Sequence, residues 1–527
     1  MRAATRRSIV IAVLVSAMGP AACRNPPGGA TADRAVPTAD PGPDLSAGLR
    51  AFGLLRMAQA RDAFAGAVRA HPDSALAHAY LGLAMNSSGN AHDEIAAAVR
   101  LAADDPPVGK ARVEAARAWA AYDRDGAVRA LDVVLAAAPG DPQPRFERGI
   151  HRLGQRRFDE AAADFRAVLQ STPSFAAARP HLARAFLRAG RIEEARAAAA
   201  EAVRELPDEP LPLLVECEVL RRAGERDAAV AACSRAIEKE PGNVSAYQGR
   251  AYVHREAGDF AAARKDFQAA FTIASVLPDA AYKDLMVDWA KAEDISFDVA
   301  MTHLLEGDWR KGILAARETA AFTQRVRPGN AVFYYDALGR IYLQDGKPRE
   351  AARAYQEGHE SIEKVAGLSE DEQTLWRGRW VHGIGRSHAR AGRFREAHAQ
   401  AALLVKMINE AGAKGDPYRP SLHYMRGYVL LEEGKYERAL EELRQANQDD
   451  VYVQWLMARA LRGRGDHAAA QVIVDNLRAA PRAGFGYALV RREVFAWRRR
   501  YPRVPAEVRD RVLHLDRGEH RPLYHSP

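Results

Sequence analysis

Apolar residues recur along most of the chain at spacings of three and four, in blocks of similar length. The block that starts at Val244 is typical, with Tyr247, Ala251, Phe260, Ala263, Phe267 and Ala270. This spacing is typical of amphipathic helices, because it places the apolar side chains on one face. Gly258 lies between the two halves of the block and predicts a turn. Each block is therefore predicted to be a helix–turn–helix unit.

Prolines mark the length of the blocks in the first half. They are Pro72, Pro106, Pro139, Pro173, Pro207 and Pro241, whose sequence numbers rise by 34, 33, 34, 34 and 34. Proline ends a helix, because the residue before it is disfavoured in helical conformation. The regular interval indicates an array of one repeated unit.

Small residues recur where the two helices of each unit should cross. In the unit from Pro142, Gly149 and Ala161 occupy positions 8 and 20, with Phe165 at position 24. Two helices approach to about 8–10 Å only where small side chains separate them. A unit of this length with these marks resembles the tetratricopeptide repeat. The resemblance implies an all-α fold, an α-α superhelix (a tetratricopeptide solenoid).

The second half keeps the turn but lengthens the unit. Its turn glycines are Gly307, Gly346, Gly392, Gly434 and Gly465, whose sequence numbers rise by 39, 46, 42 and 31. About twelve repeats are expected, in an N-terminal array over residues 45–277 and an irregular C-terminal array over 278–482. Residues 278–292 are interpreted as a helix joining the two arms, with Asp294 capping the next helix. Residues 483–527 are interpreted as a capping helix and a basic tail with a short helix at 506–515.

The N-terminus resembles a bacterial lipoprotein signal. Residues 1–22 hold three arginines, an apolar run from Ser8 to Met18 and a small-residue stretch that ends at Cys23. The run is too short for a transmembrane helix, which needs about 20 residues. The resemblance implies lipidation of Cys23 and, from the Arg24 that follows, the periplasmic face of the outer membrane. A secreted protein cut near Ala17 or Gly19 and an uncleaved anchor stay open.

Residues 23–44 are rich in Pro, Gly and Ala and predict a flexible tether. The formal net charge of +8 comes from the two ends of the chain. Residues 1–22 contribute +3, and residues 491–527, with ten arginines and five acids, contribute +5. The repeats are formally neutral, which argues against a nucleic-acid-binding surface.

The sequence contains no phosphate-binding loop, no nucleophile elbow and no His-Glu-x-x-His zinc motif. No segment outside the repeats is long enough for a catalytic domain. We therefore expect no enzyme activity, no metal and no cofactor. Cys217 and Cys233 occupy positions 8 and 24 of one unit, where both should face the interface between its helices. They are predicted either to form a disulfide or to remain two buried thiols.

In proteins of the family that the repeats resemble, positions 2, 5, 9, 12 and 13 line the concave groove. Three successive units place there Arg184, Leu187, Arg188, Leu214, Glu218, Arg221, Arg222, Tyr252 and Arg255. Recurring guanidinium groups could hold an acidic or extended peptide, and a solvated arginine-rich face is the alternative. The favoured hypothesis is a lipid-anchored scaffold that binds protein or peptide partners for assembly, secretion or envelope maintenance. The alternative is a glycan-binding outer-membrane lipoprotein of the starch-utilisation type.

Overall fold

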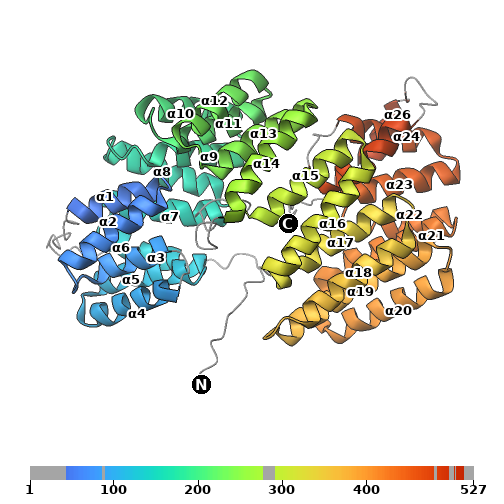
Figure 1. Ribbon diagram of the computed structural model, residues 1–527, viewed down its shortest axis with the longest axis horizontal. Coiled ribbons are helices and arrows are strands. Elements are labelled where there is room, and N and C mark those ends of the chain that lie inside the picture. The colour runs from blue at the N-terminus through green and yellow to red at the C-terminus, as the bar shows by residue number, and fades with distance from the viewer. Residues whose placement is uncertain are drawn as a thin grey trace, which may run out of the picture. The chain divides into compact units, whose positions relative to one another are not determined.

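The computed structural model describes residues 43–85, 89–276, 291–479, 484–497, 504 and 506–514. These residues form α-helices and two short 3₁₀ helices, and no strand occurs among them (Figure 1). The predicted signal, Cys23 and nearly all of the tether lie outside the described residues, as does most of the predicted joint at 278–292. Within the described ranges, no helix combines the length and the apolar character that crossing a bilayer demands.

The helices follow one another as twelve pairs within the described part of the chain, in agreement with the predicted number of repeats, and side-chain or backbone contacts join the two helices of each pair. The first seven pairs are α1 (Pro43–Gly53) with α2 (Met57–Ala70), α3 (Ala75–Met85) with α4 (Gly89–Leu101), α5 (Pro107–Ala120) with α6 (Arg124–Ala137), α7 (Pro142–Gly154) with α8 (Phe158–Ser171), α9 (Ala178–Arg188) with α10 (Ile192–Glu205), α11 (Pro210–Ala223) with α12 (Arg226–Lys239), and α13 (Val244–Ala257) with α14 (Phe260–Val276).

The next five pairs are α15 (Ala292–Glu306) with α16 (Trp309–Val326), α17 (Pro328–Gln344) with α18 (Pro348–Glu363), α19 (Glu370–Arg390) with α20 (Phe394–Glu410), α21 (Arg419–Glu432) with α22 (Tyr436–Leu443), and α23 (Val451–Arg464) with α24 (His467–Ala479). Helices α25 (Phe485–Ala496) and α26 (Ala506–His514) follow. The 3₁₀ helices span Ala102–Asp104 and Gly412–Tyr418. The prediction for Asp294 is wrong, because α15 begins at Ala292 and places Asp294 inside its first turn.

The turn inside most pairs has a residue in the left-handed backbone region. Glycine supplies it at most turns, for example Gly190 with φ 79°, because glycine carries no Cβ that would clash there. Three turns in the N-terminal half use another residue at the same place: Leu55, Tyr122 and Arg156, with φ 61°, 60° and 65°. The glycine signal therefore marks most of the turns but not all of them.

The contacts divide the chain into two compact units, and the boundary runs through α13 and α14. The N-terminal unit contains the described residues up to Val253, together with the end of α14. The C-terminal unit contains residues 254–268 and the described residues from Glu293 onward.

Each unit has contacts between distant repeats. In the N-terminal unit, His181 Nε2 of α9 lies 2.7 Å from the backbone oxygen of Gly53 in α1. In the C-terminal unit, the Tyr452 hydroxyl of α23 donates to Gln344 Oε1 of α17 at 2.9 Å. These contacts join residues 128 and 108 positions apart. The curvature of each array therefore brings repeats together that are not neighbours in sequence.

Candidate partner-binding groove

Four arginines surround one glutamate on the first helices of two successive pairs of the N-terminal unit. We call Arg184, Arg188, Arg221, Arg222 and the Glu218 between them the arginine cluster. Helix α9 carries the first two arginines and α11 carries the rest, so the repeat itself sets their spacing. Arg188 Nη2 lies 3.3 Å from Glu218 Oε1. The cluster has a formal charge of +3.

The charges act together on Glu218. Burial alone raises the pKa of this carboxyl, but the positive charges of Arg188, Arg184, Arg221 and Arg222 outweigh burial and lower the pKa below its ordinary value. Glu218 is therefore ionised at neutral pH. Counted over these five residues alone, the formal charge is positive, which favours an acidic ligand over a basic one.

The predicted groove residues differ in exposure. Arg188 and Glu218 keep 32% and 25% of their side chains exposed, and Arg222 is exposed. Leu214, Arg221 and Tyr252 are half-buried. Arg184 and Leu187 are only 8% and 7% exposed. Arg222 is therefore the most accessible of these residues, and Arg188 and Arg221 are partly accessible beside it.

Arg255 belongs to the C-terminal unit. Its Nη1 donates to Asp298 Oδ1 of α15 at 2.6 Å, and its guanidinium carbon lies 5.4 Å from the centre of the Phe267 ring. The residue is 5% exposed. Its environment is that of a buried ion pair within the unit's packing, and the structure does not place it on an open face.

A second group of groove residues was missed by the sequence analysis. Trp455, Arg459, Arg462 and Gly463 occupy positions 5, 9, 12 and 13 of the repeat that starts at Val451, which are positions that line the groove in the family. They line a pocket of about 580 Å³, the C-terminal pocket, whose other lining residues are Leu431, Tyr436, His467, Glu493, Ala496 and Trp497. The position rule, applied to this repeat, selects Trp455, Arg459, Arg462 and Gly463, but it does not select the other lining residues.

At position 9 of the repeat of α19, by contrast, the groove residue is packed into the core. Arg386, at position 9 of its repeat, is 2% exposed. Its Nη1 donates to the Tyr424 hydroxyl at 2.7 Å and its Nη2 to the Tyr355 hydroxyl at 3.1 Å. A guanidinium stays charged in proteins and needs such partners when buried. This part of the groove therefore belongs to the core.

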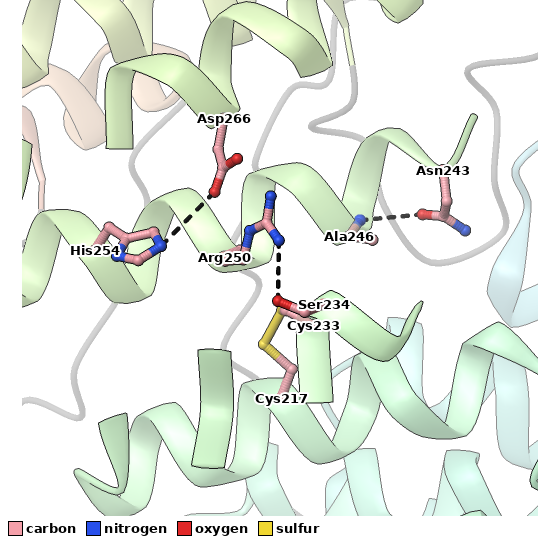
Figure 2. The surroundings of a disulfide bond; sticks show 8 residues. All are labelled: Cys217, Cys233, Ser234, Asn243, Ala246, Arg250, His254 and Asp266. Carbon is pink, nitrogen blue, oxygen red and sulfur yellow. Dashed lines mark hydrogen bonds and ion pairs between the residues drawn. A yellow bond between two sulfur atoms is a disulfide. The ribbon is translucent and has the colours of Figure 1, made fainter. Parts of the chain in front are cut away.

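The two cysteines lie side by side between α11 and α12. Figure 2 shows Cys217 and Cys233 joined by a disulfide, with Cα atoms 5.4 Å apart. Both residues are buried, at 2% and 0% exposed. A Cβ at Gly249 of α13 would lie 2.9 Å from Cys233 Sγ, so the missing side chain makes room for the sulfur. Within the described residues no group of His, Cys, Asp and Glu is arranged to hold a metal ion.

Comparison with known families identifies the repeat. The tetratricopeptide repeat family matches residues 45–110, 146–210 and 217–276, and a second tetratricopeptide description matches residues 420–448. The chain therefore contains tetratricopeptide repeats in both units. A comparison with curated proteins found no match.

Solved structures of three repeat proteins resemble parts of the chain. A tetratricopeptide repeat protein from Parabacteroides merdae is 13% identical, covers 61% of this chain and 98% of its own, with a TM-score of 0.32. The type IV pilus biogenesis factor PilW is 18% identical over 40% of this chain and 89% of its own, with a TM-score of 0.33. TTC0263 from Thermus thermophilus is 21% identical over 34% of this chain and 94% of its own, with a TM-score of 0.29. None of these structures defines the arrangement of this chain.

Proposed function

We propose that this chain, an array of tetratricopeptide repeats, is a non-catalytic scaffold that holds acidic segments of protein partners in its groove. The arginine cluster carries the proposal. Guanidinium groups bind carboxylates through paired hydrogen bonds, and the repeat sets their spacing along the groove. An extended acidic peptide offers carboxylates along its length, so it could contact Arg188, Arg221 and Arg222 together.

The proposed location is the periplasmic face of the outer membrane, where a lipid on Cys23 would anchor the protein. The proposal rests on the signal-like pattern of residues 1–22. The Cys217–Cys233 pair supports export, because structural disulfides persist in oxidising compartments and are rare in the cytosol. The tether would then hold the repeats away from the bilayer. A soluble periplasmic or secreted protein is the alternative location.

The anchor is tested by fractionation after expression with its own N-terminus. Cys23→Ser should move the protein from the membrane pellet to the soluble fraction and remove label from radioactive palmitate. A Ser16→Ala variant, which alters the apolar run and leaves the cysteine, should behave as the wild type. Palmitate label that persists in Cys23→Ser would refute lipidation at this residue.

The groove is tested by capture of proteins from detergent-solubilised envelope. Arg188, Arg221 and Arg222 are replaced together by Glu, and the matched control replaces three exposed arginines of the same unit, Arg69, Arg100 and Arg204. Both triple variants change the charge by −6. Only the first should lose its partners, with unchanged helicity. Equal capture by both variants would refute the role of the arginine cluster, and recovery of oligosaccharide without protein would favour the glycan-binding alternative.

A further inference from the structure

We propose that the C-terminal pocket binds a peptide segment in which an acidic residue lies next to an aromatic one. The inference rests on the proposed scaffold function and deepens it, because it names the chemistry that a second site would recognise. All lining residues belong to the C-terminal unit. The pocket is independent of the arginine cluster in sequence and in the unit that forms it.

Aromatic rings form the walls of the pocket. The rings of Trp455 and Trp497 meet edge to face, with centres 5.7 Å apart. The Tyr436 ring lies against α23 at Gly463, where any Cβ would overlap it. Leu431 and Ala496 add apolar surface. These walls favour an apolar or aromatic side chain, because aromatic pairs prefer such edge and tilted contacts.

The charges of the pocket leave one cation in excess. Arg459 Nη2 pairs with Glu432 Oε1 at 2.9 Å, and Glu493 Oε1 pairs with Arg492 Nη2 at 3.0 Å. Arg462 is exposed and places its guanidinium carbon 4.7 Å from the centre of the Trp497 ring. No ion pair joins Arg462 to a carboxylate within the described residues. A guanidinium held beside an aromatic wall is suited to a carboxylate whose neighbour is an aromatic residue.

The size and the open surfaces favour a peptide over a sugar. A volume of about 580 Å³ lies within the range of pockets that bury small ligands, enough for a short stretch of peptide. A sugar ring needs an open aromatic face on which to stack. Trp455 is 5% exposed, and Arg462 covers one face of Trp497. An acidic–aromatic peptide uses the groups that remain accessible, which are the exposed Arg462 and Ala496 and the half-buried rings of Tyr436 and Trp497.

The test is a calorimetric titration of the full protein with capped hexapeptides. The probe carries Asp-Phe-Asp between glycine and serine residues, and two matched probes replace both Asp by Asn or the Phe by Ala. The wild type should bind the first probe with a Kd below about 1 mM and bind either matched probe at least tenfold more weakly. Arg462→Glu should lose at least tenfold in affinity for the first probe.

Two further variants keep the result interpretable. Ala496→Trp, at an exposed position of the pocket, places an indole in the space and should abolish binding. Arg395→Glu, at an exposed position of α20 outside the pocket, should bind as the wild type. No binding by the wild type, equal binding of all three probes, or binding that survives both pocket variants would overturn the inference. If the titration fails while envelope proteins are still captured, only the pocket is refuted, and the arginine cluster is judged by its own triple variants.

Discussion

Acidification should destabilise the N-terminal unit through a buried histidine. His151 of α7 is 3% exposed, and its ring meets Trp119 edge to face with centres 4.4 Å apart. Burial, assisted by the positive charge of Arg124, lowers the pKa of His151 to about 3. Its imidazole is therefore neutral in the folded protein. At mildly acidic pH it gains a proton only when the region around it unfolds and exposes the ring.

The sign and the size follow from the two pKa values. The unfolded chain has a histidine pKa of about 6.5, so it binds a proton at a pH where the folded state does not. The stability due to neutral His151 is complete above about pH 6.5 and falls by about 1.4 kcal/mol per pH unit below it, until about pH 3. Between pH 7.5 and pH 5 the loss is about 2 kcal/mol.

His151→Phe should remove this loss, since phenylalanine keeps the ring contact and does not titrate. Urea denaturation of the full protein at pH 7.5 and pH 5, followed by hydrogen exchange of α7 and α8, gives the free energy of opening of this region. The variant should lose about 2 kcal/mol less than the wild type on acidification. Trp119→Phe is the matched control, because it alters the other ring of the pair and should lower stability equally at both pH values. An unchanged pH dependence in His151→Phe would refute the reasoning.

Two other outcomes are expected from the repeats. Loss of the disulfide by the double change Cys217→Ala and Cys233→Ala should destabilise the region around α11 and α12 by about 3 kcal/mol, because the two residues are 16 positions apart and the closed loop restricts the unfolded chain. Denaturation of oxidised wild type and variant measures the difference, and two free thiols per chain at these positions in unreduced, denatured protein would reject the bridge. Arg156→Gly should raise stability by up to about 1 kcal/mol in a thermal melt, because Arg156 has φ 65° and a left-handed residue with a Cβ is strained. Arg145→Gly, inside α7, should lower stability by a similar amount, and a gain there as well would show that the turn conformation is not the cause.

The helix pairs within each repeat could be predicted from the sequence. The proline interval and the small residues at positions 8 and 20 predicted the helix pairs, because each mark reports a contact within one repeat. Gly149 illustrates this, since a Cβ there would lie 2.7 Å from Cε1 of Phe165, its partner across the same helix pair. The turn residues Leu55, Tyr122 and Arg156 had no such signal, because these residue types do not prefer the left-handed conformation that they adopt at the turn.

The exposure of the groove side chains could not be predicted from the sequence, because it depends on contacts between repeats that are far apart in sequence. Arg386, Tyr428 and Arg459 all occupy position 9 of their repeats. The first two are 2% and 1% exposed, whereas the side chain of Arg459 keeps 29% of its surface.

Contacts between repeats contribute to this burial, since the Tyr452 hydroxyl of α23 donates to Gln344 of α17, and Arg386 donates to the hydroxyls of Tyr355 and Tyr424. At α23 no further regular repeat follows within the described residues, and α25 with the residue after it supplies Glu493, Ala496 and Trp497 as a wall in its place. A helix that does not continue the repeat cannot fill the groove as the next repeat would. Position 9 is therefore core at α19 and α21 and lines a pocket at α23, and the position rule must be combined with the contacts around each repeat to predict where a ligand can enter.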